Sequence, residues 1–281
     1  MINWKLITGI TLLAIVLITA LIGPPIVKQF YPGQSPEKAG SYPSLMKPSP
    51  EHPLGTDILG RDVVVILING IGYSLVIGFM GGLISTIIGV IIGFTAGYIG
   101  RTTDNILRVI IDMVLVIPVL PILIILSLYI PKWNTITMGV LLGVLGWAFV
   151  ARTTRAQILS LRERPYVDLA RLNNQNTLEI IFEELLPSLL PYIILGMAGA
   201  MVGNMLAEAG LQLIGIGANL PPTLGSIMSR AYNAGALSLG LYGQVLAPAG
   251  ILVGMFLALN LINMGLEEIF NPRLRIYAEE R

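Results

Sequence analysis

The stretch YVDLARLNNQNTLEIIFEELLPSLLP, residues 166–191, is the only long, strongly charged segment that lies between two strongly apolar ones. Its ionised side chains cannot sit in hydrocarbon, so we expect this stretch to lie in water. Apolar residues recur in it at helical spacing, which predicts two short amphipathic helices joined at residues 173–175. Asn176, with Glu179 three residues later, predicts a capping box at the second helix. Such a hairpin needs a surface to dock on, either a partner protein or its own membrane domain.

The composition is that of a membrane protein. Of the 281 residues, 54% are hydrophobic and only 12% are charged, and the mean hydropathy is +0.79. Soluble domains carry about twice that charge, at about 25%, and long uncharged apolar runs mark membrane spans. The sequence therefore predicts an all-α integral membrane protein with six transmembrane helices.

The chain has few residues of the types that enzymes use for catalysis. The chain has no cysteine, which excludes disulfides and thiol chemistry, and its single histidine, His52, cannot form a histidine metal cluster. It contains no Gly-Lys dipeptide and hence no P-loop, so any ATP must be bound by another subunit. We expect a non-catalytic chain with no cofactor and no bound metal.

The expected organisation follows the apolar runs. We divide the chain into a first transmembrane helix (1–28), an extracytoplasmic Pro-rich segment with the start of the next helix (29–70), a membrane domain (71–275) and a tail (276–281). Further spans are expected at about 71–98, 106–129, 136–151, 187–210 and 245–264, and residues 211–241 as a re-entrant or lid-like segment that lines a cavity. Of the 17 Lys and Arg residues, 11 fall on one side, which places both termini and the hairpin in the cytoplasm of a multi-pass cell-membrane protein.

Residues 52–63, HPLGTDILGRDV, close the Pro-rich segment and are called the extracytoplasmic motif below. Two glycines permit tight turns, and two aspartates can cap a helix that begins near Arg61. We interpret the motif as the capped start of the next span, with contact to a solute or a delivery protein as the alternative. The residues concerned are Gly55, Thr56, Asp57, Gly60, Arg61 and Asp62.

A few polar residues within the spans are candidates for a transport pathway or gate, because ionisable groups in membrane helices are costly and often functional. Asp112 lies about one turn from Arg108, which favours a local ion pair near the interface. Glu208, near the outer end of its span, could gate a cavity or reach water. The candidates are Asp112, Asn204, Glu208 and Tyr232.

The hairpin resembles the signature loop of ABC importer permeases, whose pattern is Glu-Ala-Ala, three residues, Gly, nine residues and Ile-x-Leu-Pro. Here the segment 168–170 (Asp-Leu-Ala) stands at the first element, Asn174 at the glycine and the pair 186–187 (Leu-Pro) at the end, while Glu184 replaces the Ile. Asn tolerates the left-handed backbone that Gly often adopts, so that change is mild. The extracytoplasmic motif resembles the corresponding segment of the dipeptide/oligopeptide group of these permeases. This group of permeases also has similar residues at four further places, which are Gly97-Tyr98, Asp112 with Pro118, residues 207–209 and residues 271–275.

The resemblance implies one subunit of a five-part importer. Its partners would be a second, related permease, two ABC ATPases that bind the cytoplasmic loops (here residues 165–187), and an extracytoplasmic solute-binding protein; besides these it would contact membrane lipid and no nucleic acid. Leu172, Ile180 and Ile181 would insert into an ATPase groove, with Asp168 and Arg171 at its rim. The implied coupling residues are Asp168, Leu169, Ala170, Arg171, Leu172, Asn174, Ile180, Ile181 and Pro187.

The solute stays open at this point. The group favours dipeptides or oligopeptides, while relatives with the same extracytoplasmic motif are associated with nickel and oligosaccharides. A secondary transporter or channel is the rival class, but it is expected to carry more acids or interrupted helices at mid-membrane depth.

Overall fold

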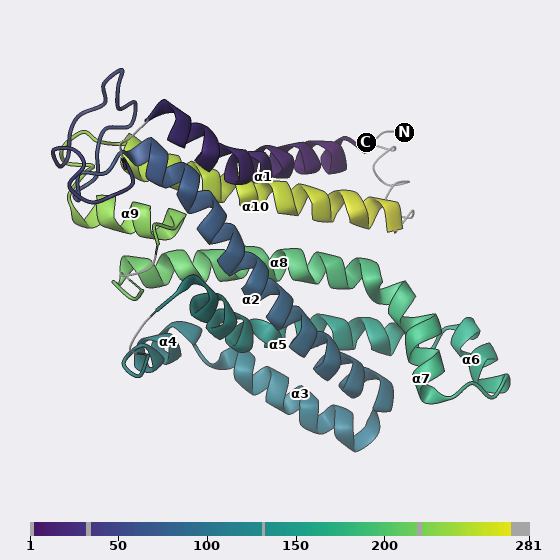
Figure 1. The fold of residues 1–281 in the computed structure, drawn as a ribbon. Coiled ribbons are helices and arrows are strands. Elements are labelled where there is room, and N and C mark those ends of the chain that lie inside the picture. The colour runs from purple at the N-terminus through teal and green to yellow at the C-terminus, as the bar shows by residue number, and fades with distance from the viewer. Residues whose placement is uncertain (1–2, 32–34, 131–132, 218–220, 271–281) are drawn as a thin grey trace.

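The computed structural model describes residues 3–31, 35–130, 133–217 and 221–270 of the chain, and these form an elongated helical bundle (Figure 1). The helices are α1 (Trp4–Phe30), α2 (Val63–Ile99), α3 (Arg101–Val116), α4 (Val119–Ser127), α5 (Thr135–Leu161), α6 (Pro165–Leu172), α7 (Thr177–Glu179), a π-helix (Ile180–Leu185), α8 (Leu186–Leu213), α9 (Leu224–Asn233) and α10 (Gly243–Phe270). Residues 271–275, which carry part of the family resemblance, and the expected tail, 276–281, lie outside the residues that the structure describes.

Five helical stretches are long and apolar enough to cross a membrane, which confirms the predicted fold class. They are α1, α2, α5, the continuous run Thr177–Leu213 and the first 24 residues of α10. The pair α3 and α4 supplies a sixth candidate only if the two helices count as one broken span, because they are bent by 74°.

The single helix expected over residues 106–129 is wrong. Helix α3 already begins at Arg101, five residues before the expected start at 106, and the helical path breaks after Val116. Pro118 has no N–H to donate and forces its predecessor out of the helical region, and Ile117 is accordingly extended, with φ −71° and ψ 122°. Helix α4 then leaves at a steep angle to α3.

Helix α2 is the central element, and it packs most extensively against α5. It begins at Val63, where Asp62 caps it, which confirms the capped start predicted near Arg61; the helix thus starts eight residues before the apolar span expected from 71. The α2–α5 contact depends on glycine: a Cβ added at Gly89 would lie 2.6 Å from Cβ of Val150 and 2.9 Å from the Trp147 carbonyl oxygen. Small residues allow membrane helices to approach this closely.

The two ends of the bundle differ (Figure 1). Helices α6 and α7 lie at the end where α1 begins and α10 ends, while the 35–62 segment and α9 gather at the opposite end. Helices α1 and α10 run side by side along one flank. The hairpin and the extracytoplasmic motif therefore lie at opposite ends of the molecule.

Candidate functional site

The charged hairpin folds as two helical arms around a tight turn. Asn174 adopts a left-handed conformation, with φ +57°, two residues after α6 ends at Leu172. Asn176 then caps α7: its side chain accepts from the Glu179 N–H at 3.0 Å, and Glu179 accepts from the Asn176 N–H at 2.8 Å. The predicted turn and capping box are both confirmed.

The second arm does not stop before the membrane span. It passes through the π-helix into α8 without a break, so the helical run begins at Thr177 and not at Pro187. The Leu186 N–H donates to the carbonyl of Ile181, five residues back, in place of the usual four-residue spacing. This wide turn immediately precedes Pro187, which has no N–H for a regular ladder.

One face of the hairpin is fixed to the membrane domain. Val167, Ala170 and Ile180 are buried in a cluster with Phe94 of α2 and Ile158 of α5. Ile180 is only 3% exposed, so the expectation that it inserts into a partner is wrong; it holds the hairpin in place. Ile181 is partly buried against the same cluster.

The opposite face is open. We call Leu169, Leu172, Leu178 and Phe182 the outer apolar face of the hairpin; each is exposed, Leu172 by 76%. An ion pair flanks it, because the Arg171 guanidinium lies 2.9 Å from the Asp168 carboxylate at the surface. Leu178 and Phe182 were missed as site residues. Their separation of four residues, one helical turn, is the signal that would have placed them on one face.

The extracytoplasmic motif is a buried network at the other end of the bundle. The Asp57 carboxylate accepts from the Arg61 N–H and the Arg61 Nε, each at 2.8 Å. Asp62 accepts from the Val65 N–H at 3.1 Å, which caps α2, and lies 2.6 Å from Nδ1 of His52. These bonds fold the segment onto the start of α2.

The same motif is tied to the last helix. The Gln244 side chain of α10 donates to the Thr56 carbonyl at 2.8 Å. Burial lowers the pKa of Arg230 on α9, and the neighbouring charge of Arg61 adds to that effect. All six motif residues singled out in the sequence are buried, which supports their structural interpretation, whereas Ile58 and Leu59 between them are exposed.

A second candidate site is a cavity of about 310 Å³ among α2, α4, α5 and α8. It is mostly apolar, and Asn204 and Ser85 are its buried polar residues. The Ser85 hydroxyl donates to the Gly143 carbonyl at 2.9 Å. Asn204 is 6% exposed, and its Nδ2 has no hydrogen-bond partner in the part of the chain that the structure describes. Its side chain lies where Gly81 of α2 and Gly146 of α5 leave space.

The other pathway candidates do not gather at this cavity. Glu208 is 1% exposed and accepts a hydrogen bond of 2.6 Å from the Thr223 hydroxyl, so it anchors α9 to α8 and does not reach water. Tyr232 is exposed on α9. Asp112 pairs with Arg152 of α5 at 2.5 Å, and the expected local partner Arg108 is farther away, at 3.8 Å.

Comparison with known proteins gives a consistent result. Residues 89–276 match the family described as the binding-protein-dependent transport system inner membrane component. The dipeptide transport system permease protein DppC of Bacillus subtilis is 32% identical over 268 residues, covering 95% of this chain and 81% of that protein. The oligopeptide transport system permease protein OppC of the same organism is 28% identical, covering 95% and 85%. A putative peptide permease protein of Brucella abortus is 32% identical, covering 82% and 76%. The chain belongs to the family of inner membrane components of binding-protein-dependent transport systems.

Proposed function

We propose that this chain is the permease subunit of an ATP-driven importer of dipeptides or oligopeptides. The coupling of this chain to ATPase subunits is inferred from the hairpin. One face of the hairpin is packed against α2 and α5, and the other presents exposed leucines and a phenylalanine to water. The names of the relatives, dipeptide and oligopeptide transport permeases, support the solute class. The hairpin then lies in the cytoplasm together with both termini.

The hairpin suits a transmitter of rigid-body motion. The outer apolar face would dock on an ABC ATPase, because desolvating several large apolar side chains stabilises association by about 1.5–3 kcal/mol each. The Asp168–Arg171 pair would lie at the rim of that contact. Since Val167 and Ile180 are packed against α2 and α5, a displacement of the docked face moves those helices as well.

The family to which the chain belongs supports the remaining subunits of the proposed importer. Two ATPases would hydrolyse ATP, a second related permease would complete the pathway, and a solute-binding protein would deliver the peptide at the α9 end. This chain itself would be non-catalytic. Nickel or oligosaccharide import through the same architecture is the second candidate for the solute.

The test uses the purified complex with Leu172→Ser and Phe182→Ser combined. We expect the Kd of the ATPase for the tagged chain to rise about a hundredfold, and ATPase recovery to fall with it, because two buried apolar contacts of about 1.5 kcal/mol each are lost. The unfolding midpoint in detergent should stay unchanged, since both side chains are exposed.

The matched control is Leu239→Ser with Tyr242→Ser, two exposed apolar residues at the opposite end, which should leave ATPase recovery intact. Peptide uptake into reconstituted vesicles, with competition by oligosaccharide and Ni²⁺, decides the solute. Full ATPase recovery with the hairpin variant would refute the docking role. Uptake that needs no ATPase would favour a secondary transporter.

A further inference from the structure

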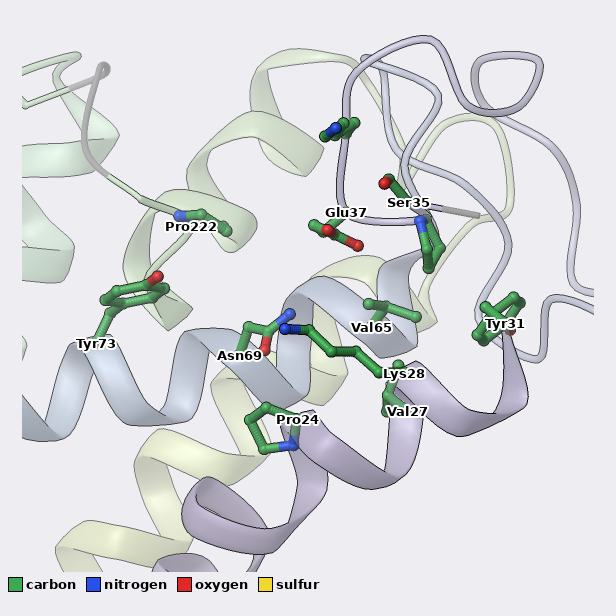
Figure 2. Close-up of a pocket in the computed structure, with 12 residues that line it drawn as sticks. Pro24, Val27, Lys28, Tyr31, Ser35, Glu37, Val65, Asn69, Tyr73 and Pro222 are labelled. Carbon is green, nitrogen blue, oxygen red and sulfur yellow. The ribbon is translucent and has the colours of Figure 1, made fainter. Parts of the chain in front are cut away.

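A polar cavity of about 610 Å³ lies between the ends of α1 and α2 near the extracytoplasmic motif (Figure 2). Lys28, Lys38 and Glu37 line it together with Asn69 and Tyr73. Two ammonium groups against one carboxylate leave the cavity with a positive charge. In Figure 2 the Lys28 side chain reaches from α1 across the gap toward Asn69 of α2.

The lysines of this cavity are not used to hold the fold together. Among the residues that the structure describes, neither Lys28 nor Lys38 forms an ion pair, in contrast to Lys5, which pairs with Glu268 at 2.5 Å. Lys28 is exposed in the last turn of α1. The Lys28 ammonium, the Asn69 amide and the Tyr73 hydroxyl line the same cavity, and they are donors of the kind that bind a phosphate.

An apolar cavity of about 510 Å³ lies deeper between the same two helices. Leu17 and Leu21 of α1 face Val76 and Phe79 of α2 across it. The groove is open beside Gly72, where an added Cβ would meet no atom within 4 Å. The groove is lined almost entirely by apolar side chains, so among the residues that the structure describes it has no hydrogen-bond partners for the backbone of a peptide.

The depth of the groove matches one leaflet of a bilayer. From Lys28 to Leu17 the chain descends 11 helical residues, which is about 16 Å at 1.5 Å per residue. Half of a hydrocarbon core of about 30 Å is about 15 Å. The polar cavity that contains Lys28 and Asn69 therefore lies about one acyl-chain length from the far end of the apolar cavity.

We propose that the groove between α1 and α2 binds one anionic phospholipid from the leaflet at the α9 end. Its phosphate contacts Lys28 and Asn69, Lys38 supplies further positive charge, and an acyl chain fills the slot beside Gly72. The lipid thereby bridges α1 to α2, two helices that pack less extensively on each other than α1 packs on α10.

Native mass spectrometry of the intact purified complex, titrated with phosphatidylglycerol or phosphatidylcholine, tests the site. We expect one phosphatidylglycerol to bind about fivefold more tightly than phosphatidylcholine. Lys28→Gln should reduce that preference about fivefold, since one basic residue near an anionic headgroup is worth about that factor. Gly72→Leu should weaken both lipids by filling the slot, whereas Gly250→Leu, on α10 and equally open, should change neither.

Three outcomes would overturn the site. Equal binding of the two lipids, unchanged by Lys28→Gln, would remove the anionic head site. Competition by inorganic phosphate alone, with Gly72→Leu without effect, would show a phosphate site and no lipid. The chain has no cysteine, so Val76→Cys introduces its only thiol. Crosslinking of this thiol to the second permease would show that a protein helix fills the groove.

Discussion

Asp62 is a residue whose carboxylate organises a whole segment. It caps α2 through the Val65 N–H, contacts the His52 ring, and accepts a weak bond of 3.4 Å from the Tyr31 hydroxyl. Burial, and then the negative charge of Asp62, raise the pKa of Tyr31 and of Tyr42. Apart from the Val65 N–H, these groups are outside the helices, so a few side-chain bonds replace regular structure in the 35–62 segment.

Asn174 is the left-handed residue of the hairpin turn, and its φ of +57° is unfavourable for most side chains. Asn174→Gly should keep the hairpin intact and stabilise it slightly or not at all. Asn174→Val should cost about 1–2 kcal/mol of local stability, since a branched Cβ opposes the left-handed conformation. Hydrogen exchange of amides 170–180 in the purified protein measures this.

The control for Asn174 is Asn173→Val, one residue earlier, where φ is −78° and the branched side chain is acceptable. Faster exchange with valine at 174 and not at 173 is the expected pattern. Equal effects at both positions would mean that the turn does not depend on its left-handed residue.

Two glycines of α2 have opposite surroundings: Gly89 lies in the tight contact with α5, and Gly72 faces open space. Gly89→Ala would place Cβ against Val150 and should cost about 1–3 kcal/mol by overpacking the α2–α5 contact. Gly72→Ala, on the same helix, meets open space and should be neutral or stabilising by up to about 1 kcal/mol. Thermal unfolding in detergent compares the two directly. A larger loss from the change at 72 would contradict the assigned packing.

The sequence alone predicts only part of the fold. Apolar length predicts the spans, and local chemistry predicts the Asn176 capping box, because both depend on residues close in the chain. The 74° break at Pro118 and the inward orientation of Ile180 were not predicted. A proline is compatible with a kinked helix as well as a break, and hairpin periodicity alone cannot tell which face meets α2 and α5.

The same reason explains the pathway candidates. Polarity within a span singles out Asp112, Asn204 and Glu208 equally. Only the fold separates them, because Arg152 of α5 pairs with the first and Thr223 binds the last, while the amide of Asn204 is left at a cavity. Partners distant in sequence decide which polar group is structural.

The hairpin and the 35–62 segment lie at opposite ends of the molecule, and the Asn204 cavity lies on the α2, α5 and α8 helices that connect them. Helices α2 and α5 also hold the hairpin through Phe94 and Ile158. A motion that begins at the hairpin therefore reaches the cavity through two packed helices. If the cavity forms part of the pathway, its one unpaired buried amide is available to a solute.

Asn204→Leu tests this role, because it separates transport from folding. Removing a buried Nδ2 that has no protein partner should leave the unfolding midpoint unchanged or raise it. Peptide uptake by the reconstituted complex should fall about tenfold, the value of one hydrogen bond of about 1.4 kcal/mol to the solute. ATPase recovery should be normal, since the hairpin is untouched. Asn260→Leu on α10, which makes the same change at an amide outside the cavity, should keep full uptake. Full uptake with leucine at 204, or a loss that tracks a lowered unfolding midpoint, would assign Asn204 to structure.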